Sequence, residues 1–200
     1  MNYFKYTNKE IEYLKNRDPL LGAEISRIGF IKRKINPDLF EALISSIISQ
    51  QISIKAAKTV YNKVINLVGE IKPQNIDRVD VEAIQKCGMS LRKAYYIKNI
   101  ADAIVNKEID FDNLYKLSDE DIIKKLVKLK GVGEWTVEML LIHSLQRPDI
   151  LSYKDLAIRR GMMRLYGLDE ITSEVFKKYR DLYSPYSTTA SLYLWEIASD

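Results

Sequence analysis

Cysteine and histidine are almost absent from this chain, whose 200 residues include one of each, Cys87 and His143. A single thiol cannot form an intramolecular disulfide, and it cannot supply the four thiolates of an iron–sulfur cluster. A single imidazole that follows an apolar run disfavours a histidine-based metal site or a catalytic triad. Disulfide scaffolds and iron–sulfur proteins are therefore excluded.

Long apolar runs and alternating strand patterns are also missing. No stretch approaches the length needed to cross a membrane, and the first residues lack a signal-peptide pattern. We find no convincing β-strand and no internal repeat. The sequence therefore predicts an all-α, cytoplasmic protein that does not contact membranes.

Helical periodicity, in contrast, extends through most of the chain. Hydrophobic residues make up 46% of it, which is enough for a real core. Thr7 and Glu10 form a capping-box pattern, and Ser53, Ser90 and Ser118 each precede a helical segment. Pro73 is interpreted as a break. We expect about ten helices.

The segment Leu126–Arg164 contains the most informative turn, Gly131-Val132-Gly133, between two apolar-periodic segments. A glycine-rich turn that opens a helix presents backbone N–H groups at the positive end of the helix dipole, which suits an anion. The amides from Gly131 to Thr136 are the candidates, and Lys128 and Lys130 add positive charge. The alternative is a plain helical hairpin that uses glycine only for its turn.

Basic residues are clustered although the net charge is only +4. The clusters are Lys32–Lys34, Lys124–Lys130 and Arg159–Arg164. Two of them flank the turn and Asp155, as a surface that faces phosphates requires. The alternative is ordinary solvated helix faces.

Several motifs together resemble the helix-hairpin-helix DNA glycosylases, in particular the 3-methyladenine DNA glycosylase II branch. They lie between Phe40 and Trp195 and read SSIISQQISIKAAKTVYNKV, CGMSLRKAYYIKNIAD, GVGEWTVEMLLI, RPDILSYKDLAIRRG and SPYSTTASLYLW. The resemblance implies two helical lobes with a cleft between them, without the N-terminal β-domain of some relatives. We assign residues 1–35 plus 149–200 to one lobe and 36–148, with the helix-hairpin-helix at 126–145, to the other.

The resemblance implies that Asp155 performs the chemistry. Breaking a glycosidic bond passes through an oxocarbenium-like state, which a nearby carboxylate stabilises. The alternative is an Asp that only caps a helix, and the two roles are compatible. Bifunctional relatives have a nucleophilic Lys at the position of Trp135, so we predict a hydrolase that uses water and has no lyase activity.

The same resemblance assigns the DNA contacts. Lys130, the turn Gly131–Gly133 and Thr136 would hold the backbone, and Gln51, with Gln50 beside it, would fill the gap left by the flipped nucleotide. Backbone carbonyls of Val127, Leu129 and Val132 would hold a monovalent cation, K⁺ or Na⁺. The alternative for the glutamines is that they satisfy backbone groups at a helix end.

An aromatic base pocket is implied by Trp135, Tyr153 and Tyr186, with Tyr183 as a further candidate. Electron-rich rings select purines that alkylation has made cationic. The alternative is that these rings pack in the core. Two positions depart from the family pattern: Ser187 stands where relatives often have Arg, and Lys130 replaces a common Pro.

We therefore predict a monofunctional, monomeric DNA glycosylase that flips out and hydrolytically releases alkylated purines of the 3-methyladenine and 7-methylguanine type in base excision repair. Its partner would be damaged double-stranded DNA, and no cofactor would be required. One alternative is a glycosylase for oxidised or deaminated bases such as 8-oxoguanine or hypoxanthine. Another is a non-catalytic helix-hairpin-helix DNA-binding module.

Overall fold

The computed structural model describes residues 2–200 and divides the chain into two compact units. The central unit comprises Asn36–Leu140, and the terminal unit comprises the residues up to Ile35 together with Leu141–Asp200. The first boundary lies where the sequence places it, whereas the second falls after residue 140 and not after 148. The physical reason is that the intervening segment already packs in the terminal unit, where His143 stacks on Trp195.

The fold is all-α, as predicted, with twelve α-helices within residues 2–200. Their bounds are α1 Asn8–Arg17, α2 Pro19–Ile28, α3 Leu39–Ser49, α4 Ile54–Val68, α5 Pro73–Asp77, α6 Val81–Gln85, α7 Leu91–Val105, α8 Asp119–Leu126, α9 Glu134–His143, α10 Leu156–Tyr166, α11 Ser173–Tyr183 and α12 Ser187–Ser199. A 3₁₀ turn, η1, spans Leu114–Lys116. None of the helices in this described part of the chain is long and apolar enough to span a membrane.

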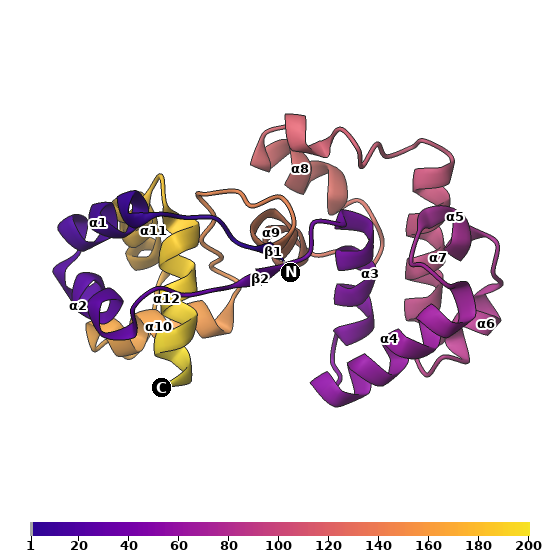
Figure 1. Cartoon of the computed structure of the whole chain (residues 1–200), viewed down its shortest axis with the longest axis horizontal. Coiled ribbons are helices and arrows are strands. Elements are labelled where there is room, and N and C mark those ends of the chain that lie inside the picture. The colour runs from indigo at the N-terminus through magenta and orange to yellow at the C-terminus, as the bar shows by residue number, and fades with distance from the viewer. Residues whose placement is uncertain (1) are drawn as a thin grey trace. The chain divides into compact units, whose positions relative to one another are not determined.

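The central unit is built around α3 and α7, which pack on each other; α4 also packs on α3, and the short helices α5 and α6 pack on α7 (Figure 1). One face of α3 is completely buried because its apolar residues recur at helical spacing. The buried residues of α3 are Leu39, Phe40, Leu43, Ile44, Ile47 and Ile48. This core fixes the C-terminal end of α3, from which the loop with Gln50 and Gln51 projects.

The terminal unit is built from both ends of the chain. Helices α10 and α12 form its most extensive contact and cross closely at Gly161, where a Cβ would overlap the carbonyl of Leu194. Leu14 of α1 and Leu21 of α2 join the same core as Leu192 and Tyr193 of α12. The core of the terminal unit therefore contains residues of α1 and α2 as well as residues of α12.

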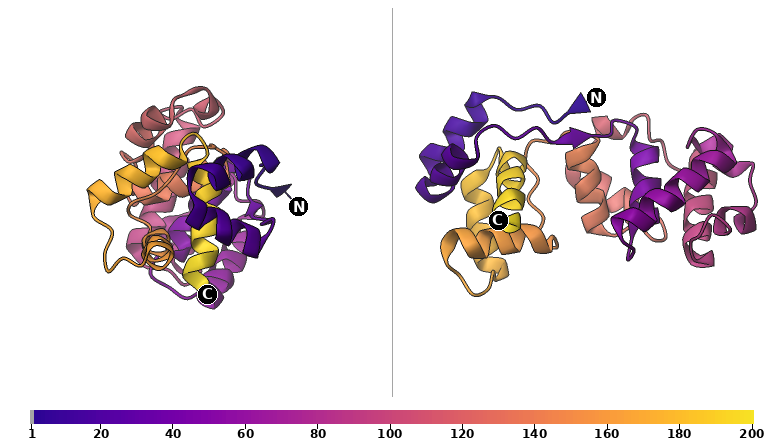
Figure 2. Two further views of the ribbon diagram at one scale, coloured as in Figure 1. Left: turned by 90° about the vertical axis from the view of Figure 1, so that its left-hand side faces the viewer. Right: turned by 60° about the horizontal axis from the view of Figure 1, so that its bottom comes forward.

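Two short strands are present although the sequence shows no strand pattern. Strand β1, Asn2–Tyr3, pairs antiparallel with β2, Lys34–Ile35, with Asn2 opposite Ile35 (Figures 1 and 2). The prediction of no strand was wrong on this point. Pairs of two residues, widely separated in the chain, have no local periodicity to reveal them.

Most helix starts follow the predicted caps. Thr7 and Glu10 form the complete capping box of α1, and the hydroxyls of Ser53, Ser90 and Ser118 cap α4, α7 and α8. Pro73 is the exception, because it begins α5 instead of only ending a segment. Proline suits the first helical position, where its missing N–H would have no partner.

Candidate nucleic-acid interface and active site

The predicted hairpin joins α8 to α9 in the central unit. Helix α8 ends at Leu126 and α9 begins at Glu134, and the N–H of Val132 donates to the carbonyl of Leu129 across the turn at 3.1 Å. The amide of Val132 is therefore used inside the turn. The amides at the start of α9 remain the candidates for the anion seat.

The two glycines of the turn serve different purposes. Gly131 has a φ of +87°, and a Cβ there would overlap the ring of Tyr96, so both its conformation and its surroundings require glycine. Gly133 has no positive φ, and nothing lies within 4 Å of where its Cβ would be. The space beside Gly133 is thus open to an approaching ligand, directly before the first residue of α9.

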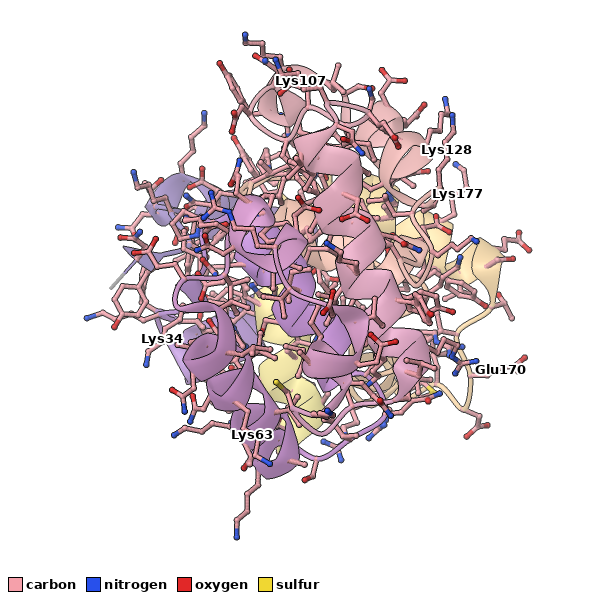
Figure 3. All side chains as sticks on the ribbon, turned by 90° about the vertical axis from the view of Figure 1, so that its right-hand side faces the viewer. Lys34, Lys63, Lys107, Lys128, Glu170 and Lys177 are labelled. Atoms are coloured by element: carbon pink, nitrogen blue, oxygen red, sulfur yellow. The ribbon has the colours of Figure 1, made fainter. Side chains whose placement is uncertain are left out.

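Positive charge surrounds this turn. Lys128 and Lys130 are both exposed, and Figure 3 shows the Lys128 side chain extending away from the ribbon. Lys124 lies on α8 and is 72% exposed, with Glu120 at 3.8 Å as its ion-pair partner. These lysines face solvent, as the sequence predicts for a surface that attracts phosphate.

The glutamine loop connects α3 to α4 and contacts the hairpin directly. Gln51 is exposed and has a φ of +57°, a conformation that is uncommon for a residue with a side chain. The amide of Gln50 donates to the carbonyl of Gly131 at 3.1 Å. The two predicted DNA-binding segments are thereby joined within the central unit, and the side-chain contact of Gln50 in this structure is to the hairpin.

Helix α7 supports both segments, a contact that no local pattern predicts. The ammonium of Lys93 donates to the carbonyls of Ile48, at 3.0 Å, and of Gln50. Burial lowers the pKa of Lys93 because it removes water from the charged ammonium. One turn along the helix, Tyr96 packs against Gly131. A single helix therefore fixes the glutamine loop and the hairpin relative to each other.

The three carbonyls expected to hold a cation belong to the same turn. Backbone carbonyl oxygens are suitable ligands for K⁺ or Na⁺. The carbonyl of Leu129 accepts the N–H of Val132 and keeps a second lone pair. Val127 is 39% exposed, whereas Val132 is buried. The donor set fits a monovalent cation in chemical type, and its occupancy stays a prediction.

Asp155 lies in the terminal unit at the start of α10. One carboxylate oxygen, Oδ1, accepts the N–H groups of Ala157 at 2.9 Å and Ile158 at 3.0 Å. The residue is 7% exposed. The capping role that the sequence offered as an alternative is therefore present, and these two bonds fix the orientation of the carboxyl group.

His143 occupies the terminal unit as a neutral ring. It stacks on Trp195 with 5.5 Å between ring centroids, and Arg33 lies over the same indole at 5.4 Å. Burial and the charge of Arg33 lower the pKa of His143 to about 4, although Asp155 opposes the shift. At neutral pH this ring therefore lacks the second, imidazolium proton that a general acid would donate.

Tyr153 is held by three neighbours in the terminal unit. The guanidinium of Arg159 lies 5.3 Å from its ring centre, Phe176 meets the ring edge-on at 5.1 Å, and its hydroxyl donates to the carbonyl of Ile171. One aromatic face is already occupied by a cation. Its predicted role in the base pocket is untested, and its present contacts are structural.

The other predicted pocket rings have more room. Trp135 of α9, in the central unit, is 40% exposed. Tyr186, in the terminal unit, is half-buried and meets Tyr13 edge-on at 5.0 Å, with Lys9 6.0 Å from its ring centre. Both stay predictions as pocket residues.

Tyr183 belongs to the core and not to a pocket. It is completely buried, and its hydroxyl bonds with Tyr166 and with the carboxylate of Asp18. The side chain of Asp18 also caps α2. The sequence could not separate Tyr183 from Tyr186, because both lie near the same helix end and only tertiary packing distinguishes them.

Ser187, which departs from the family pattern, has a local role. Its hydroxyl and its backbone N–H both donate to Oδ1 of Asp149, the N–H at 3.2 Å, while Ser184 donates to Oδ2 at 2.7 Å. Ser187 is completely buried. In this chain, two hydroxyls and a backbone N–H donate hydrogen bonds to a carboxylate at the start of α12.

Comparison with known proteins places the chain in a family. A family model described as "HhH-GPD superfamily base excision DNA repair protein" matches residues 44–185. DNA-3-methyladenine glycosylase 1 of Schizosaccharomyces pombe is 38% identical over 162 residues, covering 78% of this chain and 71% of that protein.

Two solved structures have the same fold. A DNA-3-methyladenine glycosidase from Bacillus halodurans has a TM-score of 0.89 and 37% identity, covering 99% of this chain and 93% of that one. The S. pombe 3-methyladenine DNA glycosylase Mag1, in complex with abasic DNA, has a TM-score of 0.80 and 33% identity, covering 94% of this chain and 95% of that one. The chain therefore belongs to the HhH-GPD superfamily of base excision DNA repair proteins.

Proposed function

We propose that this protein is a monofunctional DNA glycosylase that flips out alkylated purines, of the 3-methyladenine and 7-methylguanine type, and releases them by hydrolysis. The observation that carries the proposal is Asp155, a carboxylate held by two amides at the start of α10 in a chain of this family. Relatives that share the surrounding sequence are named for 3-methyladenine. Such an enzyme acts on genomic DNA as a monomer in the cytoplasm.

The chemistry needs negative charge and little else. The sugar becomes oxocarbenium-like as the base departs, and Asp155 stabilises that cation or orients the attacking water. A purine alkylated at N3 or N7 is already cationic and leaves as a neutral base, so a general acid is unnecessary. This agrees with a chain whose one histidine is neutral at working pH, because its pKa is about 4.

DNA is held by the central unit in this proposal. The open space at Gly133 admits a backbone phosphate to the amides of α9, and a cation on the carbonyls of Val127, Leu129 and Val132 would add positive charge beside it. Gln51 fills the vacated stack, since it is exposed at the tip of its loop. Lys93 and Gln50 keep that loop in place.

The decisive experiment measures free bases. Alkylated genomic DNA is incubated with the wild-type protein and with Asp155→Asn, and released bases are separated and quantified. We expect 3-methyladenine and 7-methylguanine from the wild type and loss of release in the variant. Asn keeps one oxygen for the two cap bonds, so binding to an abasic-site duplex should persist. Near wild-type release by Asp155→Asn would remove Asp155 from the mechanism.

A panel of duplexes, each with one lesion, tests the substrate class. We expect alkylated purines to be released much faster than 8-oxoguanine or hypoxanthine. Preferential release of either of those two bases would replace the proposed substrate. Binding of every duplex without any release would instead identify a non-catalytic DNA-binding module.

Water, and not an amine, is the proposed nucleophile. Trp135 occupies the position where bifunctional relatives place a Lys, and an indole cannot form a Schiff base. Borohydride added during turnover should trap no covalent protein–DNA adduct, and purified protein should leave abasic strands intact. A stable adduct would show that another lysine of this chain attacks the sugar.

A further inference from the structure

A cavity of about 570 Å³ lies in the terminal unit between α10 and the start of α11. Arg159 and Arg160 of α10 line one side of it, and Thr172 and Ser173 line the other. Glu170 lies on the loop that joins the two helices (Figure 3) and also lines the cavity. Tyr153, predicted for the base pocket, also lines the cavity, whereas the sequence assigns Arg159 and Arg160 only to a basic cluster and to no particular ligand.

The two arginines are not neutralised by the chain. Among residues 2–200, no carboxylate forms an ion pair with Arg159 or Arg160, and Nε of Arg159 is buried without a hydrogen-bond partner. Glu170 borders the same cavity but pairs with neither guanidinium. Two positive charges against one negative charge leave this cavity cationic.

The cavity is also firmly constructed. Arg159 packs over the ring of Tyr153, which Phe176 and the carbonyl of Ile171 hold in turn. Arg160 is exposed. The guanidinium of Arg159, which lies over the Tyr153 ring, and the exposed guanidinium of Arg160 are both suited to phosphate, because a planar guanidinium can donate two parallel hydrogen bonds.

The position of Arg159 on α10 indicates which phosphate the cavity would bind. Asp155 caps the helix, and Arg159 is four residues later, so the two lie on the same helix face about one turn apart. We propose that Arg159 and Arg160 bind a backbone phosphate of the damaged DNA strand, next to the nucleotide whose sugar faces Asp155. This inference rests on the proposed function for the identity of that strand.

The first test is the salt dependence of binding. Dissociation constants for a duplex with an abasic-site analogue are measured for the wild type, Arg159→Gln, Arg160→Gln and the double variant, from about 50 to 200 mM salt. Because both arginines would contact the same phosphate, the double variant should lose about 0.9 from the slope of log K against log salt, and each single variant should lose no more than that. Arg180→Gln, an exposed arginine of α11 outside the cavity, is the matched control and should retain the wild-type slope.

Two variants distinguish the loss of a DNA contact from a loss of stability. Arg160 is exposed and makes no hydrogen bond to the rest of the described chain, so Arg160→Gln should melt as the wild type does. Arg159→Lys keeps the charge but loses the fork, so it should retain the slope while binding more weakly. An unchanged slope in the folded double variant, or an equal loss in Arg180→Gln, would overturn the proposal.

The second test locates the phosphate. Single neutral methylphosphonates are placed in turn along the damaged strand, and one of them should weaken wild-type binding but not that of the double variant. The competing explanation, that the cavity binds a free anion, is tested with inorganic phosphate. If it raises the melting temperature of the wild type only, while the DNA slopes are equal, the cavity binds a free anion and the DNA assignment falls.

The two proposals can fail separately. A wild-type protein that releases no alkylated base but shows the slope change loses the proposed function and keeps the phosphate contact. A protein that releases the base with no slope change keeps the function and loses the contact.

Discussion

Gly133→Asp separates DNA binding from stability, because the structure predicts opposite effects. Gly133 precedes the first residue of α9, has no positive φ, and has nothing within 4 Å of its missing Cβ. Asp is among the preferred residues directly before a helix, and its charge complements the helix dipole. We expect the variant to be as stable as the wild type, or more stable by up to about 1 kcal/mol.

Binding should change in the opposite direction. The new carboxylate would occupy the space proposed for a DNA phosphate. Two like charges 4 Å apart repel by about 4 kcal/mol at an effective dielectric constant near 20, and salt reduces this value. We therefore expect roughly a hundredfold rise in Kd for an abasic-site duplex, equivalent to about 2.7 kcal/mol.

Two companion variants complete the assay, in which fluorescence anisotropy gives Kd and thermal melting gives stability. Gly133→Ala adds bulk without charge and should weaken binding less than Asp does. Gly131→Ala must adopt a φ of +87° and displace Tyr96, so it should lower stability by roughly 1–3 kcal/mol. Wild-type affinity in a stable Gly133→Asp protein would refute the idea that the start of α9 is a phosphate seat.

Two further predictions follow from buried polar groups. The pKa of His143 falls from 6.5 to about 4 on folding, so the unfolded chain binds more protons between these values, and stability should decrease as pH falls from 6.5 towards 4 by at most about 3 kcal/mol. His143→Gln should have a flatter stability curve across that range, and identical curves would contradict the low pKa. Lys93→Met should slow single-turnover base release from a paired duplex by about tenfold or more, because the two carbonyls lose a charged donor. The loss should be smaller for a lesion in a bulge, where flipping costs less, and Lys93→Arg should restore part of the rate; an equal loss on both substrates would indicate a general structural role.

Local signals predicted the helices well because a cap is a contact between near neighbours. Thr7, Ser53, Ser90 and Ser118 each bond to an amide two or three residues away, so the sequence contains the whole interaction. Pro73 shows the limit of such signals. The residue that interrupts one helix also suits the first turn of another, and only the following packing decides.

Long-range contacts were beyond the sequence. The bonds from Lys93 to Gln50 and from Gln50 to Gly131 join segments that no periodicity connects. The Gly-Val-Gly turn is recognisable from the sequence. Tyr96 of another helix, which leaves no room for a Cβ at Gly131 but lies away from Gly133, is not. Asp155 was identified as a helix cap from its position, whereas its catalytic role comes from the resemblance and remains to be measured.

The construction of the terminal unit from both ends of the chain has a consequence for biosynthesis. Leu14 and Leu21 are synthesised long before their partners in the same core, Leu192 and Tyr193. The central unit, in contrast, is one continuous segment and can become compact while translation continues. In nascent chains stalled before α10, residues 36–140 should therefore resist protease, whereas residues 2–35 should be cleaved.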